Sequence, residues 1–346
     1  MKNLVLITLM AMYCSCRKAP VSCDGADSLF QHSEFPVGVA INADKLIEGS
    51  DYERIATAQF NSITPENVFK ASFLHPNENT FKWSGAEALA DYCALHGKRL
   101  HGHTLIWHEQ LPEWIENFEG SRDQWASLFR VHIQTIVAHF KGRVSGWDVV
   151  NEAFEEDGTL RRTIWREHLG DGYIEQAFAY AHEADPGARL FYNDYMLEGN
   201  STKRNAVLKY FSNLRSRGVK VDGIGLQCHI TTLFPEREQL SEAMESVARE
   251  GFMVHLSEVD ISVNPLNQSM EGKDMEELLA EQADILGSLI TSFNSITPSL
   301  RYGITFWGIG DGDSWIRSHF NRQDYPLLYD DNYRPKQAYC KLKNLL

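Results

Sequence analysis

The run Trp147-Asp148-Val149-Val150-Asn151-Glu152 predicts a strand that is mostly apolar and ends in polar residues. A second run, His255-Leu256-Ser257-Glu258-Val259-Asp260, has the same layout further along the chain. In a parallel α/β barrel, the functional side chains lie at the carboxyl ends of the strands. Two such runs in one chain therefore indicate a barrel with carboxylates at its mouth.

Eight short β-rich runs alternate with longer stretches of helical pattern. The segments 121–140 and 236–250 are examples of the helical stretches, because their apolar positions recur at helical spacing. Alternation sustained eight times predicts an α/β fold, a single (β/α)8 TIM barrel, and 346 residues are enough for one such domain. The predicted strands are residues 37–42, 60–64, 100–107, 144–151, 190–195, 223–230, 253–261 and 302–307.

The N-terminus has the layout of an export signal. Lys2 precedes an apolar run at residues 4–12, and Cys14-Ser15-Cys16 follows it. The apolar run is too short for a bilayer-spanning helix, which needs about 20 apolar residues. We therefore expect residues 1–16 to form a signal peptide and residues 17–346 to form the barrel domain.

The residues before Cys16 leave two routes of export open. Ser15 and Cys16 are similar to a bacterial lipoprotein processing site, in which Cys16 is lipidated. We favour this route, which would place the protein on the outer membrane or cell surface with the Cys16 lipid as its membrane contact. Tyr13 fits the pattern poorly, so ordinary cleavage and release to the periplasm or the medium is the alternative.

Composition excludes some partners. The formal net charge is -14 and no run of Lys or Arg occurs, so nucleic acid is not an expected partner. The cysteines after Cys16 are too far apart for a zinc motif, and we expect no metal and no cofactor. We expect Cys93 and Cys228 to be buried free thiols and the protein to be a monomer.

The predicted strand ends carry carboxylates, amides, imidazoles and indoles. A barrel that is only structural needs a few charged groups there for solubility, but it does not need this convergence at one mouth. The residues are Glu66, Asn67, His103, Trp107, His108, Asn151, Glu152, Asn193, Asp194, Gln227, His229, Glu258, Asp260 and Trp307.

Two of these carboxylates, Glu152 and Glu258, match the requirements of glycosidic bond hydrolysis. One group must protonate the leaving oxygen, and an anion must meet the developing oxocarbenium ion. A single glutamate at a strand end is most often only a solvated residue. Two of them, on the fourth and seventh predicted strands of one barrel, favour a catalytic pair.

From near Phe35 almost to its C-terminus, the chain resembles the xylanases of glycoside hydrolase family 10. Each motif alone is weak, but their joint occurrence in this order is a strong signal. The motifs are Thr64-Pro65-Glu66-Asn67, His101-Gly102-His103-Thr104-Leu105-Ile106-Trp107-His108, Trp147-Asp148-Val149-Val150-Asn151-Glu152, Gln227-Cys228-His229, Ser257-Glu258-Val259-Asp260 and Thr305-Phe306-Trp307-Gly308.

The resemblance implies an endo-1,4-β-xylanase that hydrolyses internal bonds of xylan and xylo-oligosaccharides with retention of configuration. Glu152 matches the general acid/base of the family, and Glu258 matches the nucleophile. Asn151 matches the residue that bonds the sugar 2-hydroxyl. In such a double displacement, the two carboxyl groups should lie about 5 to 5.5 Å apart.

The remaining site residues are also implied by the resemblance. His229, supported by Asp260, matches the histidine that holds the nucleophile, with Gln227 beside it. Glu258 and Asp260 point the same way because they are two apart on a strand, so His229 can reach both from the neighbouring strand. Two residues, Trp307 and Trp315, match the aromatic cover over the sugar at the cleavage point. The residues that match the lining of the glycone subsites are Glu66, Asn67, Lys70, His103, Trp107 and Gln110.

Other polar residues near the mouth have a structural interpretation. We interpret Asp148 and Asp194 as structural, because carboxylates near barrel mouths often pair with Arg or cap loops. We expect His108 to lie behind the substrate-binding residues, and we leave the role of His101 open.

The chain departs from the family pattern in two places. Phe69 and Ala71 flank Lys70, where many relatives have methionine and tryptophan, so the wall of the distal glycone subsite is in question. The disulfide that often follows the nucleophile strand has no cysteines here, and we expect packing alone to hold that loop.

Two other functions fit parts of the sequence. A β-1,4-glucanase would use the same carboxylate pair, and initial rates on xylan and on soluble cellulose would separate the two activities. A glycan-binding barrel without activity would bind xylan and release no reducing ends. Such a binding protein has no use for a proton donor opposite a nucleophile, which argues against it.

Overall fold

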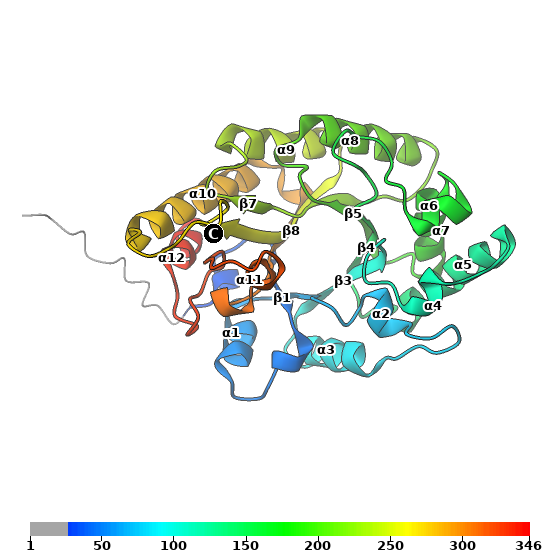
Figure 1. The fold of residues 1–346 in the computed structure, drawn as a ribbon, viewed down its shortest axis with the longest axis horizontal. Coiled ribbons are helices and arrows are strands. Elements are labelled where there is room, and N and C mark those ends of the chain that lie inside the picture. Colours follow the sequence, from blue (N-terminus) through cyan, green and yellow to red (C-terminus); the bar gives the residue numbers. More distant parts are fainter. Residues whose placement is uncertain (1–26) are drawn as a thin grey trace, which may run out of the picture.

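The computed structural model describes residues 27–346 (Figure 1). The predicted signal peptide and the proposed lipid site at Cys16 lie outside the described residues. Parallel strands form a closed barrel, in which β1 pairs with β9 and β6 pairs with β8. The strands are β1 (Val37–Ile41), β2 (Ser62–Pro65), β3 (Arg99–Ile106), β4 (Gly146–Asn151), β5 (Arg189–Asp194), β6 (Gly223–Leu226), β7 (His229–Thr231), β8 (Met253–Ser262) and β9 (Arg301–Phe306).

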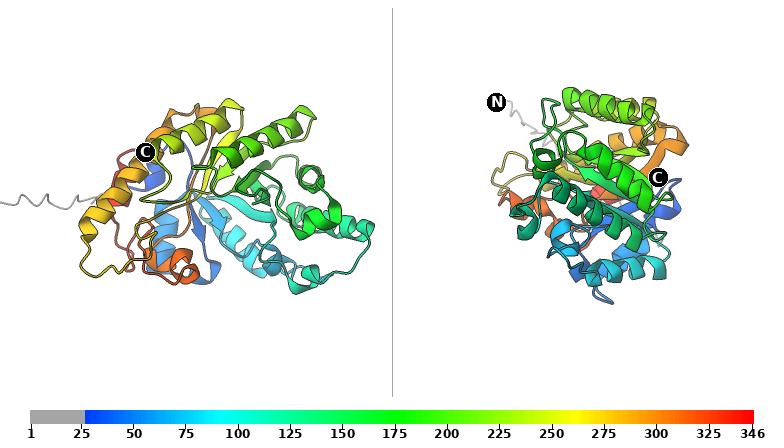
Figure 2. Two further views of the ribbon diagram at one scale, coloured as in Figure 1. Left: turned by 45° about the horizontal axis from the view of Figure 1, so that its top comes forward. Right: turned by 90° about the vertical axis from the view of Figure 1, so that its right-hand side faces the viewer.

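Helices surround the strands on the outside of the barrel (Figure 2). The alternation of strand and helix confirms the predicted (β/α)8 architecture, and the amphipathic segments 121–140 and 236–250 form α5 and α9. The longer helices are α1 (Asp51–Gln59), α3 (Ser84–Leu95), α5 (Arg122–His139), α7 (Tyr173–Ala184), α8 (Ser201–Ser216), α9 (Arg237–Arg249), α10 (Met275–Ser295) and α12 (Gln337–Lys343).

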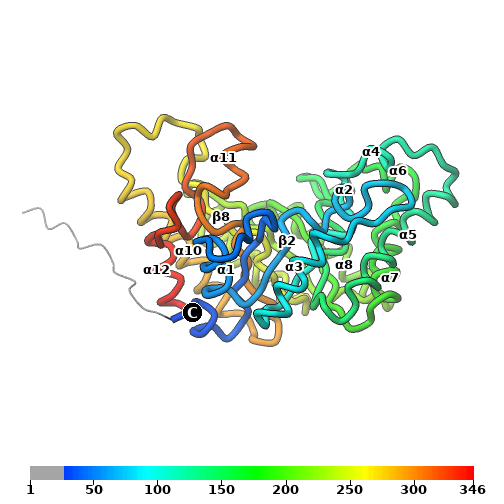
Figure 3. Tube along the Cα trace, turned by 90° about the horizontal axis from the view of Figure 1, so that it is seen from below, coloured from blue at the N-terminus to red at the C-terminus, as the bar shows by residue number. Residues whose placement is uncertain are grey.

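Four short helices gather along one side of the molecule, away from most of the long helices (Figure 3). Each of them comes directly after a strand in the sequence, so this side is the carboxyl end of the barrel. That is the end at which barrels of this kind build their sites. The four are α2 (Ala71–Leu74), α4 (Glu113–Glu116), α6 (Ile164–Leu169) and α11 (Trp315–His319).

One predicted strand is wrong in its extent. The run 223–230 forms two strands, β6 and β7, with Gln227 and Cys228 between them. The backbone of Cys228 has a φ of 59°, and its N–H donates to the Glu198 carboxylate at 2.8 Å rather than to a neighbouring strand. A left-handed residue cannot continue a strand, so the sixth position of the barrel is broken there. The other predicted strands agree with the observed ones to within two residues at either end.

The core between sheet and helices is apolar and closely packed. Trp147 of β4 is buried and lies against Gly102 of β3, where an added Cβ would come within 2.2 Å of the indole. The glycine is therefore required by the close approach of the two strands. Cys93 and Cys228 are buried free thiols, as the sequence predicts.

The loop after β8 is held by more than packing, which corrects the expectation from the missing disulfide. The Asn264 amide donates to the carbonyls of Gln323 (2.9 Å) and Gln268 (3.0 Å). The buried Asp324 carboxylate accepts from the backbone N–H of Val263 at 2.9 Å. These bonds join the loop to the segment that follows α11. Across residues 27–346, no helix combines the length and apolar character needed to cross a membrane.

Candidate active site

A pocket of about 520 Å³ opens at the carboxyl ends of the strands. It is lined by all but one of the residues that the sequence predicts for the site: Glu66, Asn67, Lys70, His103, Trp107, Gln110, Asn151, Glu152, Gln227, His229, Glu258, Trp307 and Trp315. The exception is Asp260, which is buried directly behind the pocket wall. Its carboxylate accepts from the His229 ring and from the Trp315 indole N–H, both at 2.9 Å.

Glu258 lies on β8 and is held in place on both carboxylate oxygens. Its Oε1 accepts from the Asn193 amide at 2.6 Å, and its Oε2 lies 3.1 Å from Nε2 of His229. Burial alone would raise the pKa of Glu258, but His103 and His229 outweigh it and lower the pKa below the ordinary value. Glu258 is therefore a buried but charged carboxylate, the form that an attacking group needs.

His229 is placed between two carboxylates. Its Nδ1 lies 2.9 Å from Asp260 and its Nε2 lies 3.1 Å from Glu258, since β7 pairs with β8 at this point. Burial disfavours the charged ring, yet Asp260 and then Glu258 raise the pKa of His229 well above its usual range. Both ring nitrogens then carry protons and donate to the two carboxylates. The expectation that His229 reaches both carboxylates from the neighbouring strand is confirmed.

Glu152 follows β4 directly and has a φ of 56°. This left-handed conformation costs a residue with a side chain roughly 1–2 kcal/mol, so neighbouring groups must hold it. The Glu152 N–H donates to the Asn193 carbonyl, and its carbonyl accepts from Arg161, both at 2.9 Å. The carboxylate accepts from the Trp107 indole at 2.8 Å and from the Gln227 amide at 2.9 Å. Glu152 thus faces the same pocket as Glu258.

Asn193 connects the two halves of the site; the sequence places it at a strand end but assigns it no role. Its amide nitrogen donates to both Glu258 (2.6 Å) and the Asn151 side-chain oxygen (2.8 Å). Its own oxygen accepts from the Ser257 hydroxyl at 2.5 Å. Gly225 leaves room for it, because an added Cβ would lie 2.2 Å from that oxygen. Its position at the end of β5 indicates that it lies at the mouth, but not which side chains it contacts.

Several other lining residues were also missed by sequence reasoning. Arg161 donates to the Tyr195 hydroxyl at 2.7 Å, and both side chains line the pocket with Met196, Glu109 and His319. Tyr195 follows a strand end and could have been found by the same rule as Asn193. Arg161 lies in a loop, where no pattern in the sequence marks it.

The histidines and aspartates with structural interpretations can now be placed. His108 lines the pocket, so the expectation that it lies behind the substrate-binding residues is wrong. Asp148 is buried and accepts from His103 at 2.9 Å, while His101 lies on its other side within the barrel. Asp194 is buried and pairs with the Lys203 ammonium at 2.7 Å, which agrees with a structural role.

Phe69 and Ala71 do not line the pocket. Phe69 is fully buried against the rings of Phe140 and Trp147, and Ala71 is the buried first residue of α2. Lys70 between them does line the pocket, and its ammonium lies 5.2 Å from the centre of the Trp107 ring. The aromatic surface next to Lys70 in the pocket is therefore supplied by Trp107 and not by the residue at position 71.

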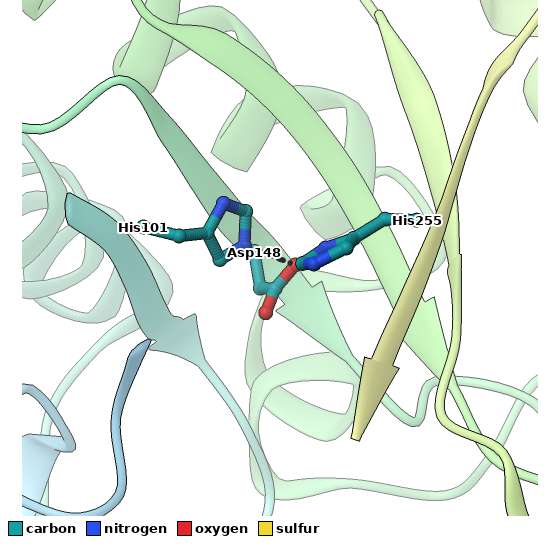
Figure 4. A group of neighbouring side chains, drawn as sticks. All are labelled: His101, Asp148 and His255. Atoms are coloured by element: carbon teal, nitrogen blue, oxygen red, sulfur yellow. Dashed lines mark ion pairs between the residues drawn. The ribbon is translucent and has the colours of Figure 1, made fainter. Parts of the chain in front are cut away.

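In the described part of the chain, the side chains that could hold a metal ion are His101, Asp148 and His255 (Figure 4). All three are buried inside the barrel, and none of them lines the pocket. The groups facing the pocket are therefore arranged as hydrogen-bonded acids, amides and rings rather than as ligands converging on an ion.

The fold and the site together define a barrel glycoside hydrolase, with a carboxylate at the end of β4 and a charged carboxylate on β8 across one pocket. The model of the family described as Glycosyl hydrolase family 10 matches residues 26–345. The chain belongs to glycosyl hydrolase family 10.

Individual relatives agree with this assignment. The chain is 39% identical over 325 residues to endo-1,4-beta-xylanase A of Caldicellulosiruptor sp. (strain Rt8B.4), covering 89% of this chain but only 46% of that longer protein. It is 36% identical to endo-1,4-beta-xylanase B of Thermotoga neapolitana, covering 93% of this chain and 90% of the relative. The structure of native xylanase 10B from Thermotoga maritima superposes with a TM-score of 0.85 at 35% identity, covering 92% of this chain and 96% of that one.

Proposed function

We propose that the chain is a retaining endo-1,4-β-xylanase that cleaves internal bonds of xylan and xylo-oligosaccharides. The observation that carries this proposal is the pair of glutamates in one pocket, of which Glu258 is kept charged by His103 and His229. The names of the relatives in family 10 support the choice of substrate.

The reaction is a double displacement. The Glu258 carboxylate attacks the anomeric carbon while Glu152 protonates the departing glycosidic oxygen, which leaves a glycosyl ester on Glu258. Glu152, now a carboxylate, takes a proton from water, and that water attacks the anomeric carbon and releases Glu258. Two inversions at one carbon give net retention.

Neighbouring groups set up each of these steps. His229 donates to Glu258 and is kept charged by Asp260, so the nucleophile is oriented and its charge is stabilised. The Asn151 oxygen accepts from Asn193, which leaves the Asn151 amide N–H groups free to donate to the sugar 2-hydroxyl. Trp315 is fixed by its bond to Asp260 and, with Trp307, offers an apolar face to the sugar ring.

We propose that the other lining residues grip the glycone end of the chain. Lys70 is largely buried and bonds Asn67 at 3.2 Å, and burial lowers its pKa and raises that of Glu66. Hydrogen-bond donors and acceptors that are partly shielded from water are suited to binding sugar hydroxyls. The set consists of Glu66, Asn67, Lys70, His103, Trp107 and Gln110.

Xylo-oligosaccharides should be cleaved faster than cello-oligosaccharides of the same length. Trp307 and Trp315 line the pocket, and the resemblance to family 10 implies that they stand where the hydroxymethyl group of a glucose unit would have to fit; xylose carries none. Initial rates with xylopentaose and cellopentaose give the two kcat/KM values. Equal values would contradict the proposed substrate and favour a glucanase, whereas binding of xylan without release of reducing ends would contradict catalysis altogether.

His229→Gln should lower kcat more than it raises KM, because His229 acts through Glu258 rather than on the polymer. Without the imidazolium, burial of Glu258 is less opposed, so the pKa of Glu258 rises. Glu258 then loses its charge at a higher pH as the solution is acidified. The acidic limb of kcat/KM should therefore move to higher pH in the variant.

The matched control for this pH profile is His139→Gln, which removes a histidine on the outside of the barrel bonded to Glu87. Its profile should coincide with that of the unaltered protein. An unmoved acidic limb in His229→Gln, with a changed KM alone, would make His229 a substrate-binding residue.

We also propose that the protein is exported and works as a monomer. The proposal for export rests on the apolar run at residues 4–12 and on Cys16, which we take as a lipid attachment site in preference to simple cleavage and release.

A further inference from the structure

Three buried side chains face one another inside the barrel, below the pocket. His101 comes from β3, Asp148 from the neighbouring β4, and His255 from β8 on the other side of the interior (Figure 4). One ring nitrogen of each histidine and one carboxylate oxygen lie within 4.8 Å of one another. The exposed fractions of the three residues are 0%, 1% and 0%, so solvent does not satisfy these atoms.

The atoms that point away from the cluster are all hydrogen-bonded. Nδ1 of His101 lies 3.1 Å from the Tyr302 hydroxyl, and Nε2 of His255 lies 3.0 Å from the Thr305 hydroxyl. The outer oxygen of Asp148 accepts from His103 at 2.9 Å. Each side chain is thus fixed in orientation from behind, as the ligands of protein metal sites usually are.

The atoms that point into the cluster are different. Nε2 of His101, Oδ1 of Asp148 and Nδ1 of His255 have no hydrogen-bond partner. The first two are 3.0 Å apart and form an ion pair, so they satisfy each other in part. A buried polar atom without a partner costs about 1–3 kcal/mol, and Nδ1 of His255 lacks even an ion pair, so the cluster calls for a partner common to all three side chains.

A proton is not a sufficient partner for all three atoms. Protonated His101 can pair with Asp148, but that leaves Nδ1 of His255 unsatisfied. A cation at the centre of the cluster would satisfy all three at once. Two imidazoles and one carboxylate are a ligand set typical of zinc and similar divalent transition metals.

We propose that His101, Asp148 and His255 form a structural binding site for one divalent transition metal ion, with zinc as the best fit. Around tetrahedral zinc, with ligands at about 2.1 Å, neighbouring ligand atoms are about 3.4 Å apart. The ring of His255 therefore moves inward by a small side-chain adjustment when the ion binds. The bound ion links β8 to β3 and β4 through the interior of the barrel.

This site is separate from the proposed catalytic chemistry and does not depend on it. The ion would touch the pocket only indirectly, because the other oxygen of Asp148 holds His103, which lines the pocket. Stability, rather than turnover, is the property it should change. The cluster could not be predicted from the sequence, because its three residues come from separate strands and lack the short spacing of a zinc motif.

The test compares the full chain prepared with a chelator with the same protein unfolded and refolded in zinc sulfate, because a fully buried site loads most easily during folding. After desalting, elemental mass spectrometry should find about one zinc per chain, and the Tm should rise by several degrees. His255→Leu should lose both the zinc and the Tm increase. His139→Gln, which removes an exposed histidine, should keep both and thereby exclude binding to surface imidazoles.

A second measurement does not depend on any variant folding well. Crystals of the zinc-loaded protein should give an anomalous difference peak between His101, Asp148 and His255 when data are collected above and below the zinc absorption edge. A zinc content no higher than in His255→Leu, or anomalous peaks only in the pocket or on the surface, would overturn the proposal.

Discussion

Replacing Glu258 by alanine should lower kcat on xylan by a factor on the order of 10⁴ to 10⁶, the range seen when an enzyme loses its nucleophile. The covalent intermediate cannot form, so an aryl xylobioside should release its aryl group without a burst. With a 2-deoxy-2-fluoro xylobioside, the unaltered protein should gain the mass of one glycosyl group on the peptide that contains Glu258. The variant should gain none.

The same variant provides a stereochemical result. Azide can enter the space left by the carboxylate and attack the substrate directly, which gives the α-glycosyl azide by a single inversion. Glu183→Ala is a suitable control, because this exposed residue of α7 pairs with surface groups of α5 and lies outside the pocket. Its kcat should be unchanged. Trapping of the glycosyl group on a residue other than Glu258 would refute the assignment of the nucleophile.

Replacing Glu152 by alanine should lower kcat on xylan by about 10² to 10⁴, the usual contribution of a general acid and base. The loss should depend on the leaving group. A dinitrophenyl xylobioside needs no protonation, so it should still glycosylate Glu258 rapidly. Because no base remains to activate water, the intermediate should accumulate and a burst of dinitrophenol should precede slow turnover.

Azide should rescue this second variant by a different route. It needs no base, attacks the α-linked intermediate on Glu258, and should give the β-glycosyl azide with faster turnover. Proton NMR distinguishes the two azide products by the coupling at the anomeric proton. If the α product came from the Glu152 variant and the β product from the Glu258 variant, the roles of the two glutamates would be reversed.

The sequence predicts the barrel well because each strand carries its own local signal. Apolar runs of limited length separated by amphipathic stretches locate β1 to β5, β8 and β9 to within two residues. The break between β6 and β7 has no such signal. It arises from a left-handed residue at Cys228 whose N–H is bonded by Glu198, and that partner is fixed only by the tertiary fold.

The site is predictable to a similar extent, and for a related reason. Residues at strand ends, such as Glu152 and Glu258, can be found because a closed parallel barrel brings those ends together. Asn193 shows where this reasoning loses detail, since its contacts to Glu258 and Asn151 depend on side-chain directions. Arg161 could not be found at all, because a loop residue reaches Glu152 only through the path of the folded backbone.

The pairing of β1 with β9 has a consequence for the order in which the protein assembles. Val37 lies beside Ile304 and Val39 beside Phe306, so nearly the whole chain separates the partners. Contacts between such distant segments form late, and until then the outer edges of β1 and β9 are both unpaired.

That final pairing also brings together the two sides of the pocket. Glu66 and Lys70 follow β2 on one side of the seam, and Trp307 and Trp315 follow β9 on the other. A chain whose helices have formed but whose barrel is still open between β1 and β9 would therefore have no complete binding cleft. During refolding, the helical circular dichroism signal should return before activity. The delay between the two measures the time taken to close the barrel.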